Sequence, residues 1–173
     1  MAGAKSIEGP VSRMINRPVA EWLARRLSRY SWVTPNMVSV ASFMVALVAG
    51  LLAWAGHLLA SGILVQASSI IDGVDGSLAR LTGRVSRAGG FLDTMLDRYA
   101  DVIVYLGAGG WLMKTDPSVG TLLLVAAALS GDLMVSYLHA RGERDAGVHP
   151  ALVGPLDYYA GRDVRLLILA VGL

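Results

Sequence analysis

The chain contains no cysteine, and this absence excludes disulfide bonds, zinc–thiolate sites and cysteine nucleophiles. Charge is also scarce: Asp, Glu, Lys and Arg make up 16% of the 173 residues, whereas an average soluble domain has about 25%. The net charge of +2 is too small to indicate a nucleic-acid partner. Hydrophobic residues make up 54% of the chain, and its mean hydropathy is +0.55. This composition predicts that lipid is the main solvent of the protein.

From Val33 to Ile71 the chain has no Asp, Glu, Lys or Arg. As one helix this segment would measure about 58 Å, which is nearly twice the ~30 Å thickness of a membrane's hydrocarbon core. It therefore predicts two spans joined by a turn near Gly56–His57. Further spans are expected in three segments, the last of them incomplete: 88–113, 117–140 and 164–173. The predicted fold is an all-α, polytopic membrane helix bundle with five spans in this chain.

The N-terminal segment has a different pattern. Apolar residues between 11 and 27 fall on one helical face, with arginines elsewhere, as in an amphipathic helix that lies in the membrane interface. A surface helix packed on the protein's own spans would show the same pattern, and the two interpretations are compatible. Pro18 is expected to bend or interrupt this helix. The chain is accordingly divided into an interfacial segment, 1–31, and a transmembrane domain, 32–173.

Basic residues predict the orientation in the membrane, because cytoplasmic loops carry an excess of Lys and Arg. They gather before the first span, between spans two and three, and between spans four and five. The turn between spans one and two has none, and the turn between spans three and four has only Lys114. The N-terminus is therefore expected to be cytoplasmic.

Four aspartates occur where spans two and three meet this cytoplasmic side. Asp72 and Asp75 are three residues apart, and Asp93 and Asp97 are four apart, so each pair shares one face of its helix. Four carboxylates in one cavity would repel each other unless divalent cations neutralise them. Oxygen ligands without His or Cys favour Mg²⁺, Mn²⁺ or Ca²⁺. Two such ions suit a displacement at phosphorus.

Small residues and an arginine accompany these acids. Gly76 and Ala79 lie on or beside the first aspartate pair, and Gly89 precedes Asp93 by four residues. Such a face lets a bulky ligand approach the backbone closely. Arg80 lies one turn after Gly76, where its guanidinium can bind a phosphate.

Aspartates at such positions also have other interpretations. Aspartates at span ends can be structural, paired with arginines in the headgroup region, but their paired helical register argues against this. Intramembrane acids can also form an ion pathway. A pathway predicts acids spread through the membrane depth, whereas these lie at one end. An inactive scaffold that kept the helix bundle is a third possibility.

The pattern Asp72-x-x-Asp75-Gly76-x-x-Ala79-Arg80, eight residues, then Gly89-x-x-x-Asp93-x-x-x-Asp97 matches every fixed position of a known signature. It resembles the CDP-alcohol phosphotransferase family over most of the chain. The resemblance implies six transmembrane helices, a homodimer, a dependence on Mg²⁺ or Mn²⁺, and release of CMP. It also implies a CDP-linked donor, an alcohol acceptor, membrane lipid as a partner, and the plasma membrane of a prokaryote. This chain is expected to lack the sixth helix.

The resemblance also implies residue roles. Asp72, Asp75, Asp93 and Asp97 would hold two metal ions, and Asp97 would be the general base for the acceptor hydroxyl. The predicted nucleotide contacts come from the first three predicted spans: Asn36, Asp72, Gly76, Ala79, Arg80 and Gly89. Asn36 belongs to Thr34-Pro35-Asn36, which resembles a short family motif, although capping the helix or bonding across helices is an equal alternative.

The acceptor is harder to predict. The segments 66–72 and 161–168 look most like members that handle inositol phosphates, such as di-myo-inositol-phosphate-phosphate synthases and phosphatidylinositol-phosphate synthases. A phosphatidylglycerol-phosphate type of synthase is the alternative, and an ion-binding transporter is the alternative from another class. Arg141, Arg162 and Arg165 are the candidates for binding the acceptor's phosphate, unless they only set the topology. Three glycines of the third span predict close helix packing and a dimer contact: Gly107, Gly109 and Gly110.

Overall fold

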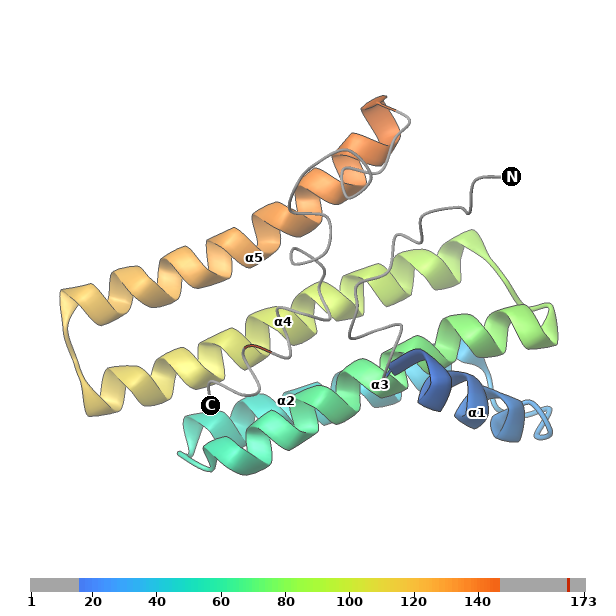
Figure 1. The fold of residues 1–173 in the computed structure, drawn as a ribbon, viewed down its shortest axis with the longest axis horizontal. Helices are drawn as coiled ribbons and strands as arrows, with labels where there is room; N and C mark the ends of the chain where they lie inside the picture. The colour runs from blue at the N-terminus through green and yellow to red at the C-terminus, as the bar shows by residue number, and fades with distance from the viewer. Residues whose placement is uncertain (1–15, 147–167, 169–173) are drawn as a thin grey trace.

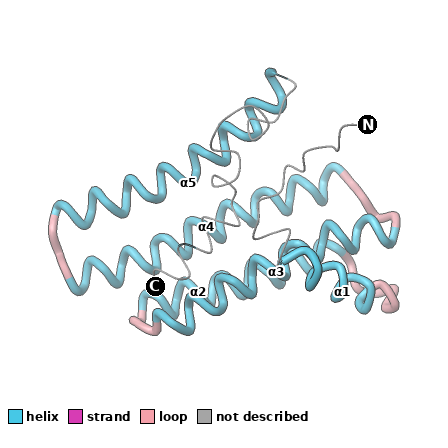
Figure 2. Tube along the Cα trace, viewed as in Figure 1, coloured by secondary structure: helices cyan, strands magenta, loops and turns pink. Residues whose placement is uncertain are grey.

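The structure, a computed structural model, describes residues 16–146 and residue 168. This part contains five helices and no strand (Figure 2), which confirms the predicted all-α class. Four long helices lie roughly along one axis, and a short helix lies beside α3 at one end (Figure 1). The helices are α1 Arg17–Leu27, α2 Pro35–Trp54, α3 Leu58–Thr82, α4 Arg87–Thr115 and α5 Val119–Ala146.

The turn between the first two long helices lies where the sequence predicts it. α2 ends at Trp54 and α3 begins at Leu58. Between them Gly56 has a φ of +88°, a backbone conformation that glycine adopts without steric cost. Thr34 caps the start of α2, where its hydroxyl accepts a hydrogen bond from the Met37 amide at 3.3 Å. The long uncharged segment is thus two antiparallel helices.

Three helices in the described part are long and apolar enough to cross a membrane: Pro35–Trp54, Leu58–Thr82 and Val119–Leu138. This composition makes the chain a multi-pass membrane protein. The predicted span 88–113 is also a helix, α4, but its first half carries too many charges for it to belong to this group. The most buried of these charges is Asp101, which is 1% exposed and therefore faces protein. The predicted span 164–173 lies outside the described residues, apart from Ile168.

The predicted glycines do permit close packing, but they do so within one chain. A Cβ at Gly107 would lie 2.2 Å from the Gly50 carbonyl oxygen, so α2 and α4 cross in near backbone contact. A Cβ at Gly110 would lie 2.0 Å from the Trp54 ring, and one at Gly109 would lie 2.5 Å from Val125 of α5. The prediction that these glycines form a dimer contact is therefore wrong, because neighbouring helices of the same chain occupy the space.

Helix α1 packs on α3 through small side chains. Ala20 and Ala24 are fully buried, and the Ala20 methyl group approaches Gly73 of α3. Pro18 lies in the first turn of α1, where its missing N–H costs no hydrogen bond, and so does not bend the described helix. Trp22, on the outer face, is 54% exposed and contacts Arg26 by a cation–π interaction. This geometry fits both interpretations of the segment, packed on the bundle and facing an interface; residues 11–15 lie outside the described part.

Candidate metal and nucleotide site

A short loop brings the two aspartate pairs together. α3 ends at Thr82 and is capped by Gly83, which has a φ of +67°, and only residues 83–86 separate it from the start of α4 at Arg87. Ser86 caps α4 by accepting a hydrogen bond from the Gly89 amide at 3.0 Å. Arg84 of this loop donates to the carbonyl oxygens of Val33 at 3.1 Å and Ser31 at 2.9 Å. The end of α3, the start of α4 and the start of α2 thus meet at one end of the bundle.

Three of the four predicted metal ligands converge. Asp72, Asp93 and Asp97 each offer a carboxylate oxygen, and these atoms all lie within 4.8 Å of one another. All three side chains are half-buried. Asp72 comes from α3, whereas Asp93 and Asp97 lie one turn apart on α4.

Asp75 lies outside this group of three. Its carboxylate accepts hydrogen bonds from the Ser39 hydroxyl of α2 and the Gly76 amide, and the side chain is 7% exposed. A spacing of three residues turns Asp75 away from Asp72 by about 60° around the helix axis, at roughly 100° per residue. Its role as a metal ligand stays a prediction.

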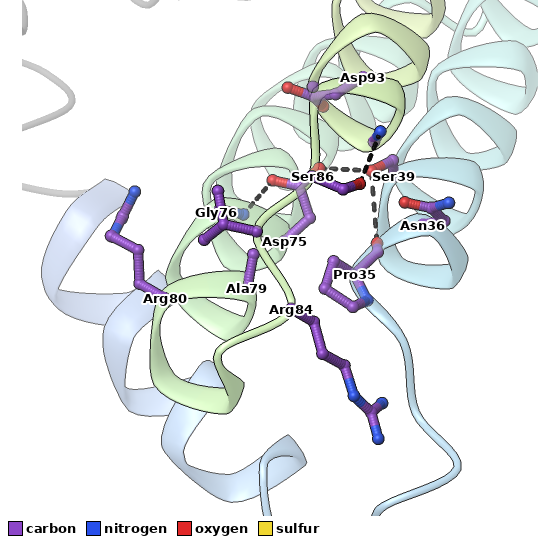
Figure 3. Close-up of a pocket in the computed structure, with 13 residues that line it drawn as sticks. Pro35, Asn36, Ser39, Asp75, Gly76, Ala79, Arg80, Arg84, Ser86 and Asp93 are labelled. Atoms are coloured by element: carbon purple, nitrogen blue, oxygen red, sulfur yellow. Dashed lines mark hydrogen bonds between the residues drawn. The ribbon is translucent and has the colours of Figure 1, made fainter.

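A cavity of about 290 Å³ adjoins the carboxylates. Figure 3 shows its lining, which comes from the starts of α2 and α4, the last turns of α3 and the loop between α3 and α4. It includes five of the six residues predicted to contact the nucleotide: Asn36, Gly76, Ala79, Arg80 and Gly89. Asp75 and Asp93 also line it, so Asp93 belongs both to the cavity and to the group of three carboxylates. The sixth predicted contact, Asp72, does not line the cavity, but it belongs to the group of three carboxylates.

The small residues of the motif leave room for this cavity. A Cβ at Gly89 would lie 2.9 Å from the Ser86 hydroxyl and 3.1 Å from the Asn36 amide oxygen. Gly89 therefore allows α4 to approach the start of α2 closely. Asn36 lines the cavity, whereas Thr34 caps the helix, so the capping alternative for Asn36 is not needed.

Three polar lining residues were not predicted from the sequence: Ser39, Arg84 and Ser86. Ser39 had a usable signal, because it follows Asn36 by three residues and so shares its helix face. Arg84 and Ser86 lie in the gap of the motif, where no residue type is fixed. Their place in the lining depends on how the loop between α3 and α4 folds, which the sequence does not show.

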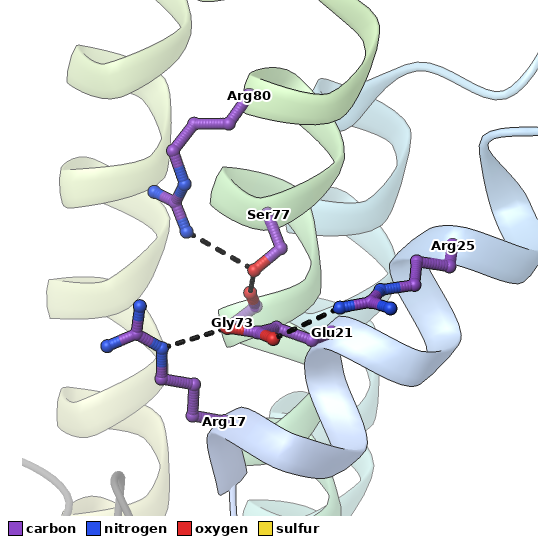
Figure 4. Close-up of polar contacts among 6 residues, drawn as sticks. All are labelled: Arg17, Glu21, Arg25, Gly73, Ser77 and Arg80. Atoms are coloured by element: carbon purple, nitrogen blue, oxygen red, sulfur yellow. Dashed lines mark hydrogen bonds and ion pairs between the residues drawn. The ribbon is translucent and has the colours of Figure 1, made fainter.

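The predicted phosphate-binding arginines differ in their surroundings. Arg80 lines the cavity and donates to the Ser77 hydroxyl at 3.2 Å. Figure 4 shows this contact beside α1, where Arg17 and Arg25 both pair with Glu21. Arg141 pairs with Asp145 on the same helix at 2.5 Å and is half exposed. Arg162 and Arg165 lie outside the described residues.

Residues 32–171 match the family model described as CDP-alcohol phosphatidyltransferase. The chain therefore belongs to this family, as its motif predicts.

Its relatives carry related names. It is 44% identical to the "Bifunctional IPC transferase and DIPP synthase" of Rubrobacter xylanophilus, over 98% of this chain and 37% of that protein. It is 34% identical to the archaetidylinositol phosphate synthase of Pyrococcus horikoshii, over 80% of this chain and 68% of that protein. The chain spans 37% of the length of the bifunctional relatives from Rubrobacter xylanophilus and Aquifex aeolicus.

Solved structures share the fold. The phosphatidylinositol phosphate synthase of Mycobacterium tuberculosis with CDP-DAG bound matches with a TM-score of 0.67 and 24% identity, over 89% of this chain and 87% of that one. The same enzyme in complex with manganese and citrate matches with a TM-score of 0.64 and 26% identity, over 88% and 82%. The polytopic helix bundle predicted from the sequence is thus confirmed.

Proposed function

We propose that this chain transfers a substituted phosphate group from a CDP-linked donor to the hydroxyl of an alcohol, with release of CMP. The observation that carries the proposal is the convergence of the Asp72, Asp93 and Asp97 carboxylates within 4.8 Å beside a cavity lined by the motif's small residues. The family relation and the names of its relatives support the same reaction type.

The three carboxylates fit a divalent cation. Oxygens bound to one Mg²⁺ at about 2.1 Å lie roughly 3 to 4 Å apart, so small side-chain rotations would bring these oxygens into range. We propose that they hold Mg²⁺ or Mn²⁺, and that a second ion binds toward Asp75, since Asp93 is shared between the group and the cavity. The ions would neutralise phosphate charge and stabilise the attacking and leaving oxygens.

The cavity would hold the cytidine nucleotide of the donor. Gly76, Ala79 and Gly89 would let the ligand approach the backbone, and Arg80 would donate to a phosphate. Asn36 would contact the nucleotide from the start of α2.

Asp97 would act as the general base. The acceptor hydroxyl gives its proton to the Asp97 carboxylate while its oxygen attacks the phosphorus distal to cytidine. The bond from that phosphorus to the bridging oxygen breaks, and the electron pair leaves with CMP. This direct displacement needs no covalent enzyme intermediate.

We propose an inositol phosphate as the acceptor. The relative at 34% identity is named archaetidylinositol phosphate synthase, and the solved structure that shares the fold is a phosphatidylinositol phosphate synthase. Arg141, Arg162 and Arg165 stay the candidates for binding the acceptor's phosphate. The active site would face the cytoplasm from the plasma membrane of a prokaryote. Homodimer formation and the division into residues 1–31 and 32–173 also stay predictions.

The test is CMP release by the purified chain in detergent or lipid vesicles. CDP-inositol, CDP-diacylglycerol and CDP-archaeol are compared as donors, each with inositol phosphate or glycerol phosphate, in Mg²⁺ and in EDTA. We expect Mg²⁺-dependent CMP release that is fastest with inositol phosphate. Failure of every donor–acceptor pair to exceed the EDTA control would overturn the proposal, and a preference for glycerol phosphate would overturn the acceptor.

Asp97→Asn tests the base. The amide cannot accept the hydroxyl proton, so we expect CMP release to fall by at least about 100-fold, the low end of a general base's typical contribution. Donor binding, measured by equilibrium dialysis of a labelled CDP-linked donor, should stay close to that of the unmodified chain. Turnover at the unmodified rate would show that Asp97 is not the base.

A further inference from the structure

A second group of charged side chains lies next to Asp97, on the face of α4 that packs against α5. Arg98 pairs with Asp101 at 3.1 Å, and its other terminal nitrogen lies 3.8 Å from the Asp97 carboxylate. The same guanidinium donates a hydrogen bond to the Ser136 hydroxyl of α5. One arginine therefore contacts two carboxylates of its own helix and the neighbouring helix.

The burial of this group makes it costly. Asp101 is 1% exposed, and Arg98 and Asp97 are 25% and 20% exposed. A buried charge is tolerated only when it is paired and hydrogen-bonded. Charged residues inside a membrane bundle point to function for the same reason. Neutralising Asp101 explains one contact of Arg98, but not its reach toward Asp97.

The contact between Arg98 and Asp97 joins two consecutive residues of α4. Consecutive residues of a helix project from different faces, so Arg98 contacts Asp97 only because its long side chain bends back. Its planar fork can contact Asp97, Asp101 and Ser136 together, which a lysine's single ammonium cannot do in the same geometry. The Asp97 carboxylate that Arg98 contacts is the one that converges with Asp72 and Asp93.

We propose that Arg98 is a positioning residue: it orients the Asp97 carboxylate toward Asp72 and Asp93, and Ser136 ties that orientation to α5. The inference rests on the role proposed for Asp97. Loss of a partner that orients a metal ligand typically lowers metal affinity or activity about 10- to 100-fold. A purely structural Arg98, which only neutralises Asp101, makes a different prediction for paired substitutions.

The experiment compares three variants with the unmodified chain: Arg98→Gln, Asp101→Asn and the double variant. The double variant removes both charges, so it leaves no uncompensated charge at Asp101. The measurements are kcat, the donor KM, Mn²⁺ affinity from the electron paramagnetic resonance signal of free Mn²⁺, and the thermal midpoint. The double variant also serves if Arg98→Gln alone fails to fold.

We expect Arg98→Gln and the double variant to lose about 10- to 100-fold in kcat, with Mn²⁺ affinity about 10-fold weaker and donor KM unchanged at saturating Mn²⁺. Asp101→Asn keeps the arginine and should stay near the unmodified chain in both. Recovery of kcat and Mn²⁺ affinity in the double variant would show that Arg98 only neutralises Asp101, and would overturn the proposal. If the unmodified chain releases no CMP, the proposed function fails, whereas the Mn²⁺ comparison still decides the role of Arg98.

Discussion

Gly50 and Gly107 lie at a close crossing of α2 and α4, where a Cβ added at Gly107 would meet the backbone carbonyl oxygen of Gly50. A flexible side chain can move aside from an added methyl group, but a helix backbone cannot do so without shifting the helix. Gly109 and Gly110 differ from Gly107, because a Cβ added there would meet the side chains of Val125 and Trp54 rather than backbone. The absence of a side chain at Gly107 thus sets how closely α2 approaches α4, the helix that carries Asp93 and Asp97.

Gly107→Ala tests this contact. The new Cβ would lie 2.2 Å from the Gly50 oxygen, so we expect a loss of about 1–3 kcal/mol from overpacking. Gly131→Ala is the matched control, because a Cβ there meets nothing within 4 Å and alanine favours a helix by up to about 1 kcal/mol. The measurement is the thermal midpoint of the helical circular dichroism signal in detergent. Equal midpoints in the two variants would contradict the close crossing.

At the residue scale, the sequence predicts which carboxylates come together better than it predicts which neighbour each residue contacts. The spacing of Asp72, Asp93 and Asp97 was enough to predict that they converge, because helical periodicity fixes which residues share a face. The pairing of Asp75 with Ser39 was not predictable, since it depends on how far α2 is rotated about its own axis. The dimer contact assigned to the glycines failed for a related reason: small residues indicate close packing without naming the partner.

At the scale of elements, the apolar contact of α1 with the bundle is centred on two buried alanines. Ala20 and Ala24 lie against α3, with Leu23 and Leu27 beside them. At the N-terminal end of α1, Asn16 is buried and donates to the Ser69 hydroxyl of α3 at 3.1 Å. The amphipathic pattern predicted the helix and its apolar face, but it could not predict α3 as the partner, because lipid and protein are equally apolar.

Ala20→Leu tests the attachment of α1. Ala20 is 1% exposed against Gly73, so a larger side chain should cost about 1–3 kcal/mol and separate the helices. Val19→Leu is the control at the adjacent position, which is 42% exposed. We expect faster amide hydrogen exchange in α1 for Ala20→Leu alone, measured by mass spectrometry. Equal exchange in both variants would mean that the buried alanines do not hold α1.

Across the whole molecule, charge and topology agree. The α1–α2 loop and the α3–α4 loop lie at one end of the bundle, and the α2–α3 and α4–α5 turns lie at the other (Figure 1). The first end has the basic loops and the candidate site, as the distribution of Lys and Arg predicts. Hydropathy alone identifies three spans in the described part, whereas α4, which was expected as the span 88–113, carries charges in its first half that keep it out of this group.

The absence of cysteine allows a direct test of this orientation, because every introduced thiol is unique. Ser31→Cys places one in the exposed α1–α2 loop, and Val119→Cys places one at the start of α5, where the side chain is 73% exposed. In intact cells, a membrane-impermeant maleimide should label Val119→Cys and not Ser31→Cys. Both should react after the membrane is permeabilised. The reverse pattern in intact cells would place the site outside the cytoplasm.

Asp93 lines the cavity and also belongs to the group of converging carboxylates, and this double membership has an energetic consequence. Under the proposed function, cation and donor would share one side chain, so each would change the free energy of binding the other. Thermodynamic linkage requires the two effects to be equal: any factor by which the cation tightens donor binding is the factor by which the donor tightens cation binding. Where the donor is scarce, the apparent metal affinity of the protein would therefore be lower. The donor concentration would then help to set the fraction of the protein that carries metal.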